Sequence, residues 1–121
     1  MRQAQDSAAK TFGKNSPWYQ LTLVGLADIL RTQGDAAGAR AVLASVERPV
    51  FAKLGPGHPY VAELERVQGL TALAIGNIAE AKPALIDAAR IFEQRYGPQH
   101  SFSRRARAEL ALQHAAPSRR T

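Results

Sequence analysis

Cysteine is absent from the 121-residue sequence, which excludes a disulfide framework, a thiolate metal site and a cysteine nucleophile. Long apolar runs are missing too: no run of roughly 18 apolar residues, the length of a membrane-spanning helix, occurs. The first residues, from Met1 to Asp6, lack the apolar core of a signal peptide. These absences predict a cytoplasmic protein with no membrane segment.

Aromatic residues are few, at 7% of the chain, whereas alanine is abundant and apolar residues reach 45%. That apolar content is typical of a folded chain, and small side chains let helices pack closely. No alternating apolar run of useful length supports a strand. The composition therefore favours an all-α fold.

The net charge of +6 is unevenly distributed. From Arg104 onward the chain holds five arginines and one acidic residue, whereas residues 1–103 hold eleven basic and nine acidic residues. The basic character therefore belongs to the C-terminal end.

One loop sequence occurs three times in the chain. The matching segments span residues 12–18, 54–60 and 96–102. Their glycines, Gly13, Gly55 and Gly97, are each 42 residues apart, and Gly34 and Gly76 keep the same period. A fixed period of this length indicates stacked structural repeats.

Local signals predict two helices in the first complete unit. Ser16 is a candidate N-cap, Pro17 suits a first helical turn and Gly34 suits a helix end. Asp35 is expected to cap a second helix, which Pro49 should kink or end early. Apolar spacing predicts the buried residues as Leu23, Leu26, Ala27 and Leu30 on the first helix and Ala39, Leu43, Val46 and Val50 on the second.

The same plan recurs 42 residues later. Pro59 follows His58 and starts a helix that Gly76 ends, and Asn77 caps the next one. The residues expected to be buried on that next helix are Ile78, Ala81, Leu85, Ala88, Phe92 and Tyr96. A last helix, after His100 and Ser101 and fading at Pro117, is expected to turn inward Phe102, Ala106, Leu110 and Ala111.

The repeat register sets the predicted domain boundaries. Residues 2–12 match the end of a second helix, so we read the chain as about two and a half repeats, with five to six helices, from a longer array. We predict one domain, residues 1–116, with loops near 13–17, 55–59 and 97–101, and a basic flexible tail at 117–121. Incomplete repeat ends expose apolar faces, from which we expect a homodimer.

The pattern Leu23-x-x-Leu26-Ala27-x-x-Leu30, followed by Ala39-x-x-x-Leu43, resembles the tetratricopeptide-repeat signature. Ala81-x-x-x-Leu85 repeats its second half. The 42-residue period and the Gly-Pro-Gly-His-Pro connector resemble the longer variant found in kinesin light chains and many bacterial repeat proteins. The resemblance covers about residues 1–115 and implies a right-handed superhelical stack of antiparallel helix hairpins, an α-solenoid.

The second unit departs from this pattern on its first helix. Glu65 and Gln68 occupy the positions of Leu23 and Leu26. Apolar residues stand beside those positions instead, at Leu64, Val67, Leu70 and Leu73. We therefore expect this helix to be rotated or to bury a second face.

The resemblance implies a non-catalytic protein–protein interaction or scaffold module whose first helices line a concave groove for a peptide or helix. Carrying the groove positions over gives Leu21, Val24, Asp28, Arg31, Glu63, Arg66, Leu70, Leu73, Arg105, Ala108 and Leu112. Mixed leucine and arginine suits an acidic or amphipathic protein segment. On this view Leu70→Asp or Arg66→Glu weakens partner capture while helicity stays normal.

Other candidate sites have simpler interpretations. His58 and His100 recur at the repeat period and precede helices, so we expect helix capping rather than metal binding. The Gly-Pro-Gly loop lacks the lysine and serine or threonine of a phosphate-binding loop. Glu63 and Arg66 are expected to form a surface pair. No nucleophile with its base can be assembled, so no enzyme activity, cofactor or metal is predicted.

The C-terminal arginines leave one alternative open. Arg104, Arg105, Arg107, Arg119 and Arg120 suit phosphates or an acidic partner. A nucleic-acid-binding or regulatory helical domain is therefore the alternative function, although only Phe102 supplies a nearby aromatic side chain.

Overall fold

The computed structural model describes residues 16–115, and side chains as far as residue 112. This part of the chain is helical throughout and contains no strand, as expected. The six helices are α2 (Pro17–Thr32), α3 (Ala36–Ala44), α4 (Arg48–Ala52), α5 (Pro59–Ala74), α6 (Ile78–Tyr96) and α7 (Ser101–Ala115). None of these helices has the length and apolar character needed to cross a membrane.

The helices keep the predicted 42-residue period. The starts of α2, α5 and α7, at Pro17, Pro59 and Ser101, are 42 residues apart, and so are the starts of α3 and α6. The predicted loop at 55–59 precedes α5 and that at 97–101 precedes α7, whereas Gly13 and the segments 2–12 and 117–121 lie outside the described residues.

Two glycines with positive φ end equivalent helices in the same way. At the end of α2, Asp35 N donates to Leu30 O at 2.8 Å and Gly34 N to Arg31 O at 3.0 Å. At the end of α5, Asn77 N and Gly76 N make the matching pair of bonds at 2.8 and 3.1 Å. Each pair is a Schellman motif, and Gly34 and Gly76 have φ of 91° and 85°.

The capping predictions are confirmed at every described helix start where they were made. Ser16 accepts a hydrogen bond from Trp18 N at 3.1 Å, and Asp35 accepts one from Gly38 N at 2.8 Å. Asn77 accepts one from Glu80 N at 3.2 Å. Pro49 has the predicted effect too, because α3 ends before it and α4 begins with it in its first turn.

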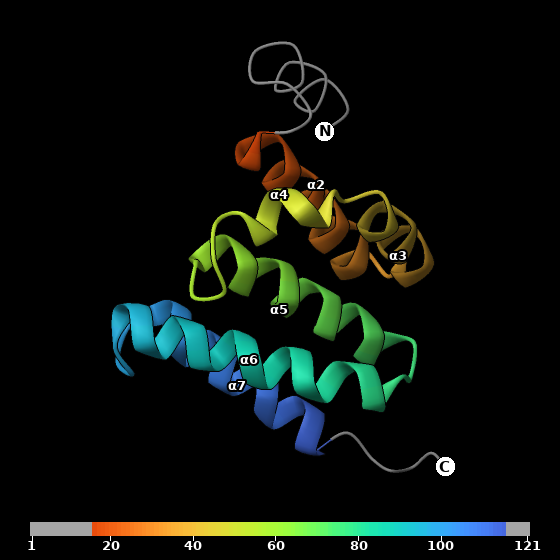
Figure 1. Cartoon of the computed structure of the whole chain (residues 1–121). Helices are drawn as coiled ribbons and strands as arrows, with labels where there is room; N and C mark the ends of the chain where they lie inside the picture. The colour runs from red at the N-terminus through yellow and green to blue at the C-terminus, as the bar shows by residue number, and fades with distance from the viewer. Residues whose placement is uncertain (1–15, 116–121) are drawn as a thin grey trace.

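Helix α5 lies at the centre of the molecule (Figure 1). It packs most extensively on α6 and also contacts α2, α3, α4 and α7. Both of its faces are consequently buried, one through Ala62, Gly69 and Ala72 and the other through Leu64 and Val67. The expectation of a second buried face on this helix is confirmed.

The predicted core is correct for most positions. Ala39, Leu43, Val46 and Val50 are buried, as are four of the six residues expected on α6. The other two, Ile78 and Tyr96, are exposed, and so are Phe102 and Ala111 on α7. These four lie at helix ends or on the last helix, where no later helix of the described chain covers them.

Candidate functional site

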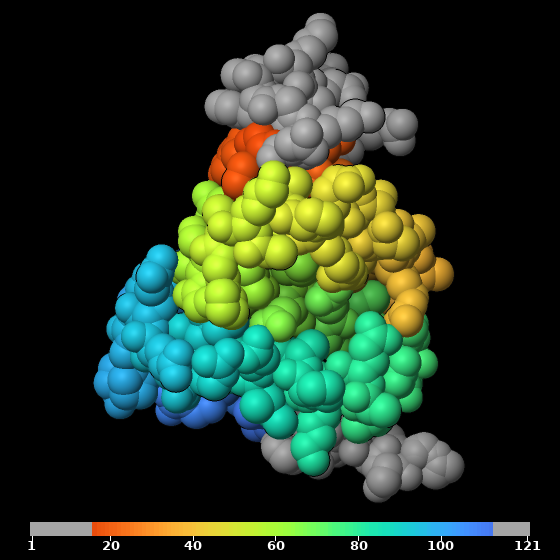
Figure 2. Space-filling view, viewed as in Figure 1, coloured from red at the N-terminus to blue at the C-terminus, as the bar shows by residue number. Residues whose placement is uncertain are grey.

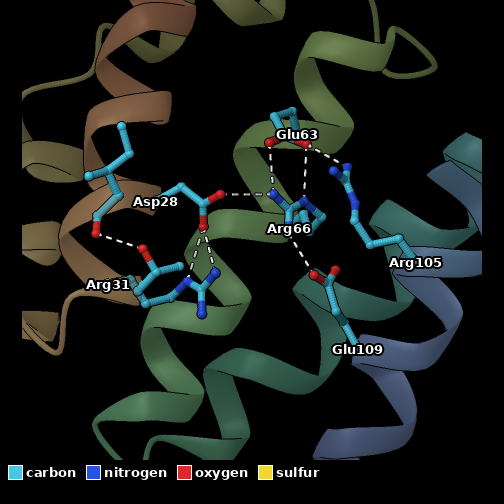
Figure 3. Close-up of polar contacts among 8 residues, drawn as sticks. Asp28, Arg31, Glu63, Arg66, Arg105 and Glu109 are labelled. Atoms are coloured by element: carbon cyan, nitrogen blue, oxygen red, sulfur yellow. Dashed lines mark hydrogen bonds and ion pairs between the residues drawn. The ribbon is translucent and has the colours of Figure 1, made fainter. Parts of the chain in front are cut away.

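A buried arginine connects the three helices that were expected to line the groove. Arg66 on α5 is only 4% exposed. Its guanidinium donates to both carboxylate oxygens of Glu63 at 3.1 and 2.9 Å, to Glu109 Oε2 on α7 at 2.7 Å and to Asp28 Oδ2 on α2 at 3.1 Å (Figure 3). One side chain therefore ties together α2, α5 and α7.

Two further arginines extend these contacts to either side. Arg31 donates to Asp28 Oδ1 at 2.7 Å, and Arg105 donates to Glu63 Oε1 at 3.1 Å (Figure 3). We call the set of six side chains the charge network: Asp28, Arg31, Glu63, Arg66, Arg105 and Glu109. Its three arginines and three carboxylates balance, so the network presents little net charge to a partner.

Burial and ion pairing act in opposite directions on the pKa values of this network. Burial alone would lower the pKa of Arg66, but the hydrogen bond and charge of Glu63 and the charges of Glu109 and Asp28 raise it. Burial raises the pKa of Glu109, against the opposing effects of Arg66, Arg105 and Arg31. Arg66 thus stays cationic, and its role is to hold helices together.

Beside the charge network lies a cavity of about 360 Å³ between α2, α5, α6 and α7. We call it the aromatic pocket. Its lining residues are Leu21, Gly25, Pro59, Tyr60, Glu63, Phe92, Tyr96, Phe102 and Arg105. A concave, mostly apolar site with a few polar groups is the usual form of a binding site in proteins.

Aromatic rings pack against one another along one wall of this pocket. The ring centroids of Phe102 lie 5.8 Å from Phe92 and 5.5 Å from Tyr96, the latter edge to face. The Arg105 guanidinium lies 5.4 Å from the Phe102 centroid, in cation–π range. Tyr96 and Phe102 are nevertheless 39% and 41% exposed, so a partner can reach them. Rigid aromatic rings supply contact area at low entropic cost.

The predicted groove residues divide into three groups. Leu21, Glu63 and Arg105 line the aromatic pocket, and Asp28, Arg31 and Arg66 belong to the charge network. Ala108 and Leu112 are exposed on α7, and Leu73 is partly buried.

Three of the predicted groove residues are too buried for the role given to them. Leu70 is 6% exposed and Val24 and Arg66 are less exposed still, so the expectation that Leu70 offers an exposed leucine to a partner is wrong. The cause is the central position of α5 between its neighbouring helices. Glu63 and Arg66 do form the predicted pair, but Arg66 is not at the surface.

The sequence interpretation missed Glu109 and the aromatic residues at the end of α6. Glu109 follows Arg105 by four residues, one helical turn, which is the available signal that the two share a face. Tyr96 and Phe102 flank the repeated loop, and the register gave them core positions. Their exposure together reflects the packing of α6 on α7, which the repeat pattern alone does not specify.

Both predicted histidine caps are confirmed. His58 Nδ1 accepts from Tyr60 N at 3.0 Å, and His100 Nδ1 accepts from Phe102 N at 3.1 Å. Burial, with a smaller effect of the Arg95 charge, lowers the pKa of His58 and favours the neutral ring that this cap requires. Among the described residues, no group of three or more potential ligands is arranged to hold a metal ion.

Comparison with known proteins identifies no relative: no protein-family model matches the chain, and no curated protein matches it. The candidate site is therefore interpreted from its own geometry.

A carboxyl pair between α5 and α6 gives the structure a pH dependence. Burial raises the pKa of Glu65 to about 8, assisted by a hydrogen bond to Asp87 and by the Asp87 charge, and Arg90 opposes this. The hydrogen bond from Glu65 lowers the pKa of Asp87, against the effect of burial. At neutral pH Glu65 is therefore protonated and donates to the Asp87 carboxylate.

The sign of the resulting effect on stability follows from proton uptake. Glu65 has a pKa of about 4.5 when unperturbed and about 8 when folded, so folding binds a proton between these values. Its stabilising contribution is complete below about pH 4.5 and is lost as the pH rises to about 8. The Asp87 contribution is lost only at pH below 3.8, outside that range.

We predict that Glu65→Gln removes this pH dependence, because the glutamine amide donates to Asp87 without titrating. Between about pH 4.5 and about pH 8, wild type should lose about 1–2 kcal/mol more unfolding free energy than the variant. Urea denaturation across this range measures the difference, and parallel pH profiles for the two proteins would contradict the assignment.

Proposed function

We propose that this chain is a non-catalytic module that binds a protein segment along the surface formed by α2, α5 and α7. We further propose that its helix pairs form a tetratricopeptide-like α-solenoid of about two and a half units. The 42-residue period of helix starts and the matching Schellman turns support this architecture. Arrays of this kind present extended surfaces to partners.

The observation that carries the function is the aromatic pocket with Arg105 at its edge. Phe102 and Tyr96 are exposed there, although large aromatic side chains are more often buried. Arg105 is exposed as well and donates only one of its printed hydrogen bonds, to Glu63, so most of its N–H groups remain available to a ligand. An amphipathic segment that offers an apolar side chain to the pocket and a carboxylate to Arg105 suits this chemistry.

The alternative of nucleic-acid binding draws less support from the described residues. Arg105 pairs with Glu63 and Arg107 pairs with Glu93, which reduces the positive charge that α7 can offer to phosphates. Arg119 and Arg120 lie outside the described residues. Filter binding of random DNA or RNA at two salt concentrations distinguishes the alternatives, since phosphate contacts are strongly salt-dependent.

Selection of peptides from a random displayed library against the full chain tests the proposal. We predict that enriched peptides combine an apolar and an acidic residue, and that Phe102→Ala or Arg105→Ala weakens their binding at least about tenfold, since each removes a pocket contact worth about 1.4 kcal/mol or more.

Ile86→Ala is the matched control, because Ile86 is exposed to a similar extent on α6 but does not line the aromatic pocket. Circular dichroism verifies that each variant keeps its helicity. Failure to enrich any peptide, or equal binding by Ile86→Ala and Phe102→Ala, argues against a binding site in this pocket.

A further inference from the structure

A second cavity lies on the face of the molecule formed by α3, α4 and α6. In the space-filling view a hollow separates the yellow surface of α3 and α4 from that of α6, and α5 forms its floor (Figure 2). The cavity has a volume of about 180 Å³. It is lined by Arg40, Leu43, Ala44, Arg48, Gln68, Thr71 and Glu80. None of these residues belongs to the aromatic pocket or the charge network.

The floor of this cavity contains an unsatisfied hydroxyl group. Thr71 on α5 is 1% exposed, and its Oγ1 has no hydrogen-bond partner among the described residues. Leaving a buried polar group without a partner is destabilising, and native proteins usually avoid it. The hydroxyl therefore calls for a partner supplied from the cavity.

Two arginines stand above this floor with only one carboxylate between them. Arg40 pairs with Glu80 at 3.0 Å. No carboxylate among the described residues lies within ion-pair distance of Arg48, whose guanidinium instead faces the amide oxygen of Gln68. The cavity therefore carries a net charge of +1, and its unpaired cation is Arg48.

The repeat register does not require these polar residues. Gln68 and Thr71 occupy the positions that Leu26 and Ile29 hold 42 residues earlier, on α2. The equivalent face of the preceding unit is therefore apolar where this one offers an amide and a hydroxyl. The polar character is specific to the junction between α3, α4, α5 and α6.

We propose that this cavity binds a phosphate group, with Arg48 and Arg40 as charged donors and Thr71 as a neutral donor at its floor. The volume corresponds to roughly six water molecules, which is ample for a tetrahedral oxyanion. Arginine is well suited to phosphate because its N–H groups match the oxyanion geometry. Glu80 competes for Arg40 in the empty cavity, and its exposed side chain can turn outward while Asn77 Nδ2 still donates to it.

Isothermal titration of the full chain with inorganic phosphate, at ionic strength matched with chloride, tests the proposal through changes of opposite sign. Arg48→Gln should weaken phosphate binding about tenfold and the near-isosteric Thr71→Val about fivefold, as expected for losing a charged and a neutral hydrogen bond. Glu80→Gln should strengthen it, because the competing carboxylate is removed. Arg90→Gln, at the equivalent position one period later, should leave it unchanged.

The outcomes separate the proposal from its alternatives. No phosphate binding beyond chloride, or equal binding by wild type, Arg48→Gln and Thr71→Val, overturns it. Weaker binding in Glu80→Gln than in wild type also overturns it, since that variant should gain affinity. A phosphoserine peptide that binds tighter than inorganic phosphate identifies a phosphorylated protein as the source, whereas equal affinities identify the free anion.

Discussion

Arg66→Ala is expected to lower the free energy of unfolding by about 3–5 kcal/mol, the usual cost of removing one partner from a buried ion pair. The variant leaves Glu63, Glu109 and Asp28 without the guanidinium that all three share. Since those carboxylates come from three helices, the packing of α2 and α7 on α5 should weaken together. Arg66→Glu should be worse, because it adds a fourth carboxylate to the same space.

Urea unfolding followed by circular dichroism measures this loss. Arg107→Ala is the matched control, because its ion pair with Glu93 is exposed and such pairs contribute about 0–1 kcal/mol. If Arg66→Ala and Arg107→Ala unfold at the same urea concentration, the charge network does not hold the three helices together. This expectation replaces the one drawn from the sequence, in which Arg66→Glu left helicity normal.

Helix positions could be predicted because their determinants are local. Each cap, proline and terminal glycine acts within a few residues of its own position, as the bonds from Asp35 N to Leu30 O and from Tyr60 N to His58 show. The 42-residue period then multiplied each local signal. An element that one loop marks weakly is marked again in the next unit.

The candidate site could be predicted only in part, because its contacts join residues far apart in the chain. The register correctly grouped Asp28, Arg66 and Arg105 on the first helices of successive units. It did not reveal that Arg66 reaches Asp28 across 38 positions and Glu109 across 43, which converts a supposed surface charge into a buried connection.

The burial of α5 explains a second error of the same kind. Leu70 was placed on the partner side by equivalence with Asp28, which is partly exposed at the edge of the molecule. A central helix has neighbours on both sides, whereas α2 lacks an earlier helix among the described residues. Equivalent positions in a repeat therefore share a direction but not the same degree of exposure.

Gly69→Val is expected to destabilise the fold by about 2–4 kcal/mol, mainly by overpacking the contact between α5 and α6. A Cβ at Gly69 would lie 2.8 Å from Leu85 Cδ2 and 3.2 Å from the backbone oxygen of Ala81. Leu85 is itself almost completely buried, so it has little space in which to move. The equivalent residue on α2 is Ala27, which indicates that α5 and α6 approach more closely at this point than the preceding pair.

Alanine substitutions at two helical glycines give a test in which the signs differ. Gly25→Ala in α2 meets no atom within 4 Å and should stabilise by about 0.5–1 kcal/mol, because alanine favours a helix. Gly69→Ala gains the same propensity but loses more to the contact with Leu85 and Ala81, so its net effect should be a loss of about 1 kcal/mol. Thermal unfolding of both variants beside wild type shows the result. A gain in stability at Gly69 as well as at Gly25 means that α6 can shift away from α5 at little cost, and the tight contact then has no role in holding the two helices together.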